Sequence, residues 1–257
     1  MDTLTWKRQD KAYHEDQHVV QTFDRRIIRK YRLEHKYYTL EKWIDVLVEK
    51  KATDVLDVGC ATGTASLALA RRGLHAFALD ASHAMLEEVQ RKAKLESLHV
   101  ACVLGDAEQM PFTDKQFDGV ICMGVLHHLH DIEKGIEEQI RVLKKGGILF
   151  ISEPFWHRPW FSLPYHACVE ALRWVLRAFK GKFLSTPERL LTHDHLNQIK
   201  TILDRQGLVY DIEFFVYWPN VIVYLPQRLG LGLVRFLNRM NQGSNRGDSV
   251  FISVRKP

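Results

Sequence analysis

The sequence contains little cysteine and no long apolar run. Its four cysteines are widely spaced and form no C-x-x-C pair, which argues against a disulfide framework or a zinc knuckle and favours a reduced, intracellular compartment. No stretch reaches the ~18 apolar residues that a membrane-spanning helix requires. The first residues carry charges of both signs and lack the apolar region of a secretory signal. We therefore expect a cytoplasmic protein, whose membrane contact, if any, is peripheral.

The composition excludes global disorder. Of the 257 residues, 46% are hydrophobic, 11% are aromatic and 26% are charged, which suffices for one large α/β domain or two small ones. The net charge of +5 is uneven: it is +3 over residues 1–51, −5 over 52–154 and +7 over 155–257. The acidic middle therefore looks like a separate functional unit. The modest positive balance is by itself weak evidence for a nucleic-acid partner.

Hydrophobic periodicity separates a helical start from a region in which strands and helices alternate. Residues 12–51 carry apolar side chains at a three-to-four spacing, and we expect residues 1–51 to form an N-terminal helical cap. The expected strands that follow are 55–58, 75–80, 99–104, 117–123 and 147–154. The expected helices between them are 64–72, 82–94 and 131–144. This alternation predicts an α/β fold, with helices on both faces of a parallel sheet.

The C-terminal part departs from this rhythm. Residues 156–165 combine two prolines with several aromatic side chains and are expected to form a loop or lid. The remaining expected elements are helices at about 166–180 and 192–206, and strands at 208–218 and 249–255.

The most informative segment is the turn after the first strand, DVLDVGCATGTASLALARRG at residues 54–73. Gly59 and Gly63 allow the backbone to pass close to a ligand, and the N–H groups at the start of the next helix favour an anionic group. Dinucleotide-binding enzymes also use a glycine turn here. Asp57, however, lies inside the strand, where it suits a cationic amine better than a pyrophosphate.

Three further strand ends carry polar candidates. Asp80 ends the second strand, where a carboxylate can accept from both hydroxyls of a ribose; its alternative role is to cap the next helix, which Ser82 can also do. Asp106 follows the third strand and can accept from an adenine amino group. The residues VLHHL follow the fourth strand. All of these lie at strand carboxyl ends, where open α/β sheets bind ligands.

The motifs VLDVGCATG, ALDAS, GDAEQMPF, FDGVICMGVLHHL and LKKGGILFISEP cover about residues 50–155. In this order they resemble class I S-adenosylmethionine-dependent methyltransferases, and in particular the type 11 domain of ubiquinone/menaquinone and other small-molecule methyltransferases. The resemblance implies a Rossmann-like sheet of seven strands, the last one antiparallel, and S-adenosyl-L-methionine as cofactor. It places the methyltransferase domain at residues 52–257, with helical lid inserts at about 155–185 and 219–247.

The resemblance also implies a cofactor site. Its expected residues are Asp57, Gly59, Cys60, Gly63, Asp80, Ala81, Asp106, Ala107 and Met123. Asp57 and Gly59 would lie near the methionine amine. Asp80 would hold the ribose, and Asp106 and Ala107 would frame the adenine. The sequence departs from the family at residue 61, where an alanine replaces a frequent glycine; its small methyl group should still permit binding.

Methyl transfer from a sulfonium is an in-line displacement, so positioning and exclusion of water can supply much of the rate. A general base is needed only for an acceptor that arrives protonated. His127 and His128 are the candidate bases, with packing or capping of their loop as the alternative. Asp131 and Glu133 mark a helix start rather than the acid cluster of a metal-assisted enzyme, so no metal ligand is expected.

The two inserts, at about 155–185 and 219–247, each combine apolar bulk with basic groups. Such segments can roof an acceptor pocket, lie at a lipid surface or pack on their own domain. We therefore expect a small hydrophobic or amphiphilic acceptor, which could be lipid-like.

Two other classes of function stay open. One is an RNA methyltransferase, because VLHHL and the basic flanks also resemble the branch that modifies tRNA wobble-uridine side chains; no recognised RNA-binding module is appended, which counts against it. The other is a non-catalytic module that binds S-adenosylmethionine, against which the complete cofactor motifs argue. Salt-dependent RNA retention and cofactor binding without turnover would distinguish them. The oligomeric state is left open.

Overall fold

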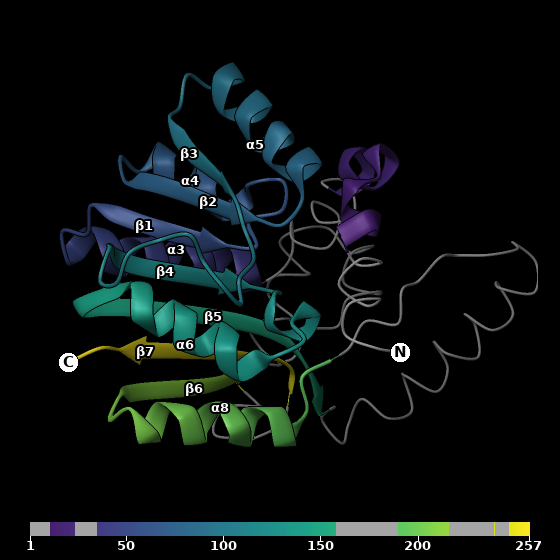
Figure 1. The fold of residues 1–257 in the computed structure, drawn as a ribbon. Coiled ribbons are helices and arrows are strands. Elements are labelled where there is room, and N and C mark those ends of the chain that lie inside the picture. The colour runs from purple at the N-terminus through teal and green to yellow at the C-terminus, as the bar shows by residue number, and fades with distance from the viewer. Residues whose placement is uncertain (1–10, 24–34, 158–189, 216–238, 240–246) are drawn as a thin grey trace, which may run out of the picture.

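The structure is a computed structural model that describes residues 11–23, 35–157, 190–215, 239 and 247–257. These residues form a seven-stranded sheet with helices on both faces (Figure 1). The strand order is β3-β2-β1-β4-β5-β7-β6, and β7 runs antiparallel to both of its neighbours. The predicted fold class, a mostly parallel Rossmann-like sheet with an antiparallel last strand, is confirmed.

The elements keep the labels of Figure 1. The strands are β1 (Asp54–Val58), β2 (His75–Asp80), β3 (Val100–Leu104), β4 (Phe117–Met123), β5 (Leu143–His157), β6 (Val209–Phe215) and β7 (Gly247–Arg255). The helices are α3 (His35–Glu49), α4 (Thr64–Arg71), α5 (His83–Leu95), α6 (Ile132–Val142), α8 (His193–Arg205) and the short 3-10 helix η1 (Leu126–His128). Residues 11–15 and 17–23 are also helical.

Most expected elements lie within one or two residues of their predicted bounds, and β2 and β4 match at both ends. The predicted helix 131–144 is too long, because α6 ends at Val142 and the chain enters β5 at the next residue. The predicted strand 147–154 is too short, because β5 pairs with β4 from Leu143 to Ser152 and with β7 from Ile148 to His157.

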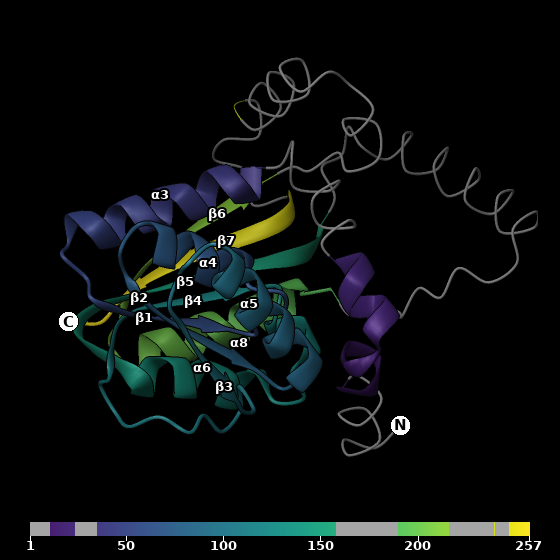
Figure 2. The ribbon, with the colours of Figure 1, turned by 90° about the horizontal axis from the view of Figure 1, so that it is seen from above.

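Alternate residues of the strands divide the core between the two faces of the sheet. Val55 packs with α3 and α4, whereas its neighbour Leu56 packs in the cluster that contains α6 and α8. Ala78 packs beneath α5, on the same face as α3 and α4. Figure 2 shows α3 and α6 on opposite sides of the sheet. The described residues therefore form three layers, in which buried strands are covered by amphipathic helices.

The division into a cap at 1–51 and a domain at 52–257 stays a prediction. Within the first range, α3 packs directly on the sheet, while residues 11–23 lie against α5. Both predicted inserts, and the predicted helix 166–180, fall almost entirely outside the described residues. Among the residues that are described, no helix has the length and apolar character needed to cross a membrane.

We expect Trp43→Ala to remove a large part of the packing between α3 and the sheet. Trp43 is 7% exposed, and its ring stacks on Phe150 with centroids 4.8 Å apart and meets the Phe251 ring edge-on. The free energy of unfolding should fall by about 3–5 kcal/mol in urea denaturation. Val48→Ala, at an exposed position of the same helix, should change it by about 0.5 kcal/mol or less. Equal losses in the two variants would contradict this packing.

Candidate functional site

The sheet order creates a topological switch point between β1 and β4. From β1 the chain moves outward to β2 and β3, and then returns to place β4 on the other side of β1. Open α/β sheets bind ligands outside the carboxyl ends of the strands at such a point. The turn after β1 and the turn after β4 are in contact here, because a Cβ added to Gly59 would lie 2.5 Å from Cγ2 of Val125. The structure thus brings together two of the predicted site segments.

The turn after β1 contains three residues with positive φ: Gly59 at 62°, Ala61 at 47° and Gly63 at 86°. Ala61 therefore lies in the left-handed region, which favours glycine. This conformation accounts for the glycine that class I methyltransferases frequently have at this position. A Cβ on Gly63 would lie 2.9 Å from Cγ2 of Val89 in α5. The chain's own packing and backbone geometry thus require both glycines, independently of any ligand.

Asp57 is buried at the carboxyl end of β1, with 3% of its surface exposed. Its Oδ2 accepts hydrogen bonds from the backbone N–H of Ser66 at 2.9 Å and from the Ser66 hydroxyl at 2.5 Å. Ser66 is in the first turn of α4, where the helix dipole favours a carboxylate. Asp57 therefore fixes the start of α4, and its predicted contact with a cofactor amine stays a prediction.

Asp80 connects the glycine turn to the start of α5. Its Oδ2 accepts from the N–H of Ala61 at 2.8 Å, and its Oδ1 accepts from the N–H of Ser82 at 2.9 Å. Ser82 itself caps α5 by accepting from the N–H of Met85, as the alternative interpretation foresaw. Burial raises the pKa of Asp80, although these N–H groups and the charge of His14 oppose the shift. The side chain thus couples β1, β2 and α5.

The other predicted cofactor residues lie around the same edge. Cys60 is buried, and burial raises the pKa of its thiol. Ala81 is exposed just before α5, and Met123 ends β4 beside Ser152 of β5. Ala107, in the turn after β3, packs against the core cluster below. The structure therefore places these residues at neighbouring strand ends, and their contact with a ligand stays a prediction.

The loop after β3 contains Asp106, whose Oδ1 accepts from the N–H of Glu108 at 2.9 Å. Glu108 in turn accepts from the N–H groups of His130 at 2.7 Å and Asp131 at 3.2 Å, at the start of α6. This loop is therefore tied to the segment that follows η1. These hydrogen bonds fix the predicted adenine site relative to the histidine loop, residues 125–129, which follows β4.

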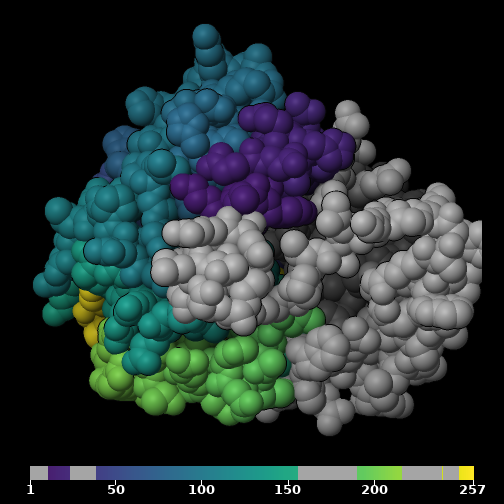
Figure 3. Space-filling view, turned by 45° about the vertical axis from the view of Figure 1, so that its right-hand side comes forward, coloured from purple at the N-terminus to yellow at the C-terminus, as the bar shows by residue number. Residues whose placement is uncertain are grey.

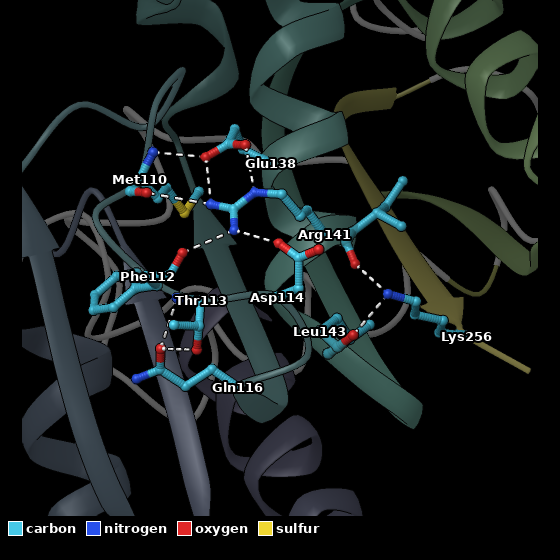
Figure 4. A network of polar contacts seen from close by, with 10 residues as sticks. Met110, Phe112, Thr113, Asp114, Gln116, Glu138, Arg141, Leu143 and Lys256 are labelled. Atoms are coloured by element: carbon cyan, nitrogen blue, oxygen red, sulfur yellow. Dashed lines mark hydrogen bonds and ion pairs between the residues drawn. The ribbon is translucent and has the colours of Figure 1, made fainter.

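A second anchor of this loop is Arg141 of α6 (Figure 4). Its guanidinium donates to the carbonyl oxygens of Phe112 at 2.8 Å and Met110 at 3.2 Å. It also pairs with Glu138 and Asp114, and Glu138 accepts from the N–H of Met110 at 2.7 Å. The planar guanidinium thus bonds both carbonyl and carboxylate oxygens of the loop and α6. Sequence reasoning did not identify this network.

The candidate base His127 is oriented by a buried carboxylate. Its Nδ1 lies 2.7 Å from Oε2 of Glu153 in β5, and only 9% of the His127 side chain is exposed. The other oxygen of Glu153 accepts from the N–H groups of Val125 at 2.7 Å and Leu126 at 2.8 Å. Burial alone would raise the pKa of Glu153, but His127 and these N–H groups hold it below its ordinary value.

The second candidate base, His128, lies beside the pair that His127 forms with Glu153. Its ring is beside that of His127, with centroids 4.1 Å apart. On its other side, the ring of His14 meets it edge-on at 5.5 Å. Sequence reasoning missed Glu153 and His14 as site residues. Glu153 lies in the quoted motif LKKGGILFISEP, where an acid inside an apolar strand was an available signal.

The chain is similar to known methyltransferases. Residues 56–151 match the family described as a methyltransferase domain. The demethylmenaquinone methyltransferase of Thermobifida fusca is 40% identical over 106 residues, which are 41% of this chain and 44% of the relative. The ubiquinone biosynthesis O-methyltransferase of Coxiella burnetii is 32% identical over 111 residues, 43% of this chain and 47% of the relative. The chain thus spans less than half the length of these curated relatives.

Two solved structures show the same fold over nearly the whole chain. A possible histamine N-methyltransferase from Thermotoga maritima has a TM-score of 0.61 at 17% identity, covering 95% of this chain and 100% of that one. The magnesium protoporphyrin IX methyltransferase of Synechocystis, with bound SAH, has a TM-score of 0.61 at 18% identity, covering 98% and 100%. At such identities the likeness establishes the fold.

We expect the charge of Glu153 to stabilise the fold in a pH-dependent way. Because its pKa is lowered from 4.5, the unfolded chain binds this proton more readily, so the contribution is full above about pH 4.5 and is lost as the pH falls through the lowered pKa. Glu153→Gln should reduce the free energy of unfolding by about 3–5 kcal/mol at pH 7, because it removes one partner of a buried pair.

The difference between wild type and Glu153→Gln should shrink in urea denaturation as the pH is lowered. Glu96→Gln is the control, because Glu96 pairs with Arg71 at the surface and both side chains are at least 40% exposed. Its effect at pH 7 should be small, because solvent screens a surface pair. A large loss for Glu153→Gln that stays constant down to acid pH would contradict the assignment of a buried charge.

We expect Arg141→Met to weaken binding of S-adenosylhomocysteine, because the loop that carries Asp106 and Ala107 loses its anchors. Calorimetry should show a several-fold rise in Kd, and the free energy of unfolding should fall by about 1–3 kcal/mol. Arg91→Met is the matched control: that side chain is 59% exposed and pairs with Glu88 on its own helix. A Kd for Arg141→Met equal to that of the control would remove the link between this network and the cofactor.

Proposed function

We propose that the chain is a class I S-adenosylmethionine-dependent methyltransferase that methylates a small hydrophobic or amphiphilic acceptor. Its residues 56–151 match the methyltransferase domain family of type 11. The observation that carries the proposal is the convergence of Asp57, Asp80 and Asp106 with His127 at the carboxyl ends of neighbouring strands. This is where the fold binds ligands.

The chemistry of these residues fits the cofactor. S-adenosyl-L-methionine, when bound, supplies an electrophilic methyl group on a cationic sulfonium. The carboxylate oxygens of Asp80 each accept one backbone N–H and have further lone pairs for the two hydroxyls of a ribose. Asp57 and Asp80 together provide the negative potential that suits an amine and a sulfonium. The glycine turn next to them allows a ligand to approach the backbone closely.

Of the two candidate bases, His127 is the better suited. Because the ionised carboxylate of Glu153 can only accept hydrogen bonds, Nδ1 of His127 is the donor to it, and Nε2 of a neutral ring would then carry the lone pair. At Nε2 the imidazole can take the proton of an acceptor hydroxyl. Glu153 then stabilises the imidazolium that forms, while the electrons of the O–H bond remain on the attacking oxygen.

The named relatives support a quinone-like acceptor. By its name, one relative acts on demethylmenaquinone, and the other acts in ubiquinone biosynthesis. Both names point to quinone-type small molecules, which favours a small-molecule acceptor over tRNA. One of them is an O-methyltransferase, which agrees with a base placed to receive a hydroxyl proton. We therefore propose a hydroxylated, quinone-like ring as acceptor. The lid role of the two inserts, and any membrane contact, remain predictions.

The test is to incubate the full chain with methyl-labelled cofactor and cell extract, and to ask which fraction receives the label. Label should enter lipid-soluble or small products. His127→Ala should lower this transfer by about 10²–10⁴-fold while S-adenosylhomocysteine binding is retained, because the loss concerns proton transfer. His130→Ala, at an exposed position of the same loop, is the matched control. Label in RNA would contradict the proposed small-molecule acceptor. Full transfer by His127→Ala would contradict the proposed role of His127 as a base.

A further inference from the structure

The helical segment of residues 11–23 is fastened to the first turn of α5. Oε1 of Glu15 accepts from the N–H of His83 at 2.9 Å, and Oε2 accepts from the N–H of Ala84 at 3.2 Å. The Ser82 hydroxyl donates to the carbonyl oxygen of His14 at 2.9 Å. The first N–H groups of a helix lack partners within it, and the helix dipole favours a carboxylate there. Glu15 is therefore a latch between this segment and α5.

Apolar contacts support the latch. Val19 and Val20 are 7% and 5% exposed, and they pack with Ala84 and Met85 of α5. Ala61 of the glycine turn lies against the same cluster. Figure 3 shows residues 11–23, in purple, as a continuous patch on the surface beside α5. The segment thus rests on α5 and on the turn that follows β1.

The latch determines where His14 lies. The residue directly before Glu15 has its ring edge-on to His128, with centroids 5.5 Å apart, and His128 adjoins His127. The carbonyl oxygen of His14 also accepts from the hydroxyl of Ser82, whose backbone N–H binds Asp80. One residue of the N-terminal segment therefore reaches both the predicted ribose site and the histidine loop.

We propose that residues 11–23 form a wall of the cofactor site that is closed by the Glu15 latch, and that His14 is a positioning residue that holds His128 beside His127. This inference rests on the proposed function, because it assigns the segment to that same site. Exchange of cofactor then requires the latch to open. The wall excludes water from the site while it is closed.

The first test is Glu15→Gln in the full chain, with S-adenosylhomocysteine as the probe. The variant keeps the size of the side chain and removes the charge that faces the helix dipole. Its dissociation rate in stopped-flow measurements should rise about tenfold, because charge-assisted hydrogen bonds become neutral ones. Glu87→Gln is the matched control: it removes a carboxylate from α5 that is 57% exposed and pairs with the His83 ring instead. Its rate should stay within about twofold of wild type.

The second test follows the Cε1–Hε1 NMR signal of His128. His14→Ala removes the neighbouring ring and should shift and broaden this signal. His14→Phe keeps a ring edge against His128 and should retain one sharp signal. If His14 served the fold alone, the His128 signal would not depend on the presence of a ring at position 14. Circular dichroism and thermal melting establish that each variant is folded.

The outcomes separate the two proposals. Wild-type dissociation in Glu15→Gln would overturn the latch, and an unchanged His128 signal in His14→Ala would overturn the positioning role of His14. The proposed function stands in both cases. Failure of the wild-type chain to bind S-adenosylhomocysteine would overturn the proposed function, and this inference with it. Neither measurement requires the acceptor to be identified.

Discussion

The buried carboxylate of Glu153 is the constraint on which the candidate active site depends. A charge with no exposed side-chain surface is costly unless it is paired and hydrogen-bonded, and both of its oxygens are engaged, one by His127 and one by two backbone N–H groups. The loop after β4 therefore has little freedom, because a different path would leave the charge without these partners. This requirement sets the position and the tautomer of the candidate base.

The same requirement reaches across the sheet. The N–H of Val125 binds Glu153, and the Val125 side chain fills the space beside Gly59 in the turn after β1. In that turn, the N–H of Ala61 binds Asp80 at the end of β2. A series of contacts thus runs from β5 to β2 through the loops at the carboxyl ends. The predicted ribose site and the candidate base are parts of one packed arrangement rather than independent features.

Sequence reasoning predicts the parts of this arrangement that have a local signature. Strands such as 75–80 and 117–123 are visible because short apolar runs alternate with helical periods, and the glycine turn is visible because its residue types are unusual. An acid inside an apolar strand marks Glu153 as unusual, but its pairing with His127 cannot be read from the sequence around either residue. The pairing arises because β4 and β5 pair in parallel, with Met123 opposite Ser152, which brings residues 26 positions apart into contact. The contact between His14 and His128 depends on an even longer loop closure.

The opposite end of the sheet shows why burial, rather than hydrogen bonding alone, distinguishes the candidate site. At the amino end of β4, Asp118 also accepts backbone N–H groups, from Thr53 and Asp54, and it pairs with Lys144 at 2.9 Å. That carboxylate is partly exposed, its partner is 35% exposed, and the pKa of Asp118 is held well below its ordinary range. Its partners are two backbone N–H groups, the Thr53 hydroxyl and a lysine, so it joins strand ends.

Glu153 uses the same kind of hydrogen bonds but faces the imidazole of His127. The Glu153 side chain has no exposed surface and the His127 side chain is 9% exposed, so the two groups interact more strongly than a pair at the surface. The two ends of the sheet therefore use one structural device for different purposes. A surface ion network secures the amino ends of the strands, and a buried pair at the carboxyl ends fixes the loop that contains the candidate base.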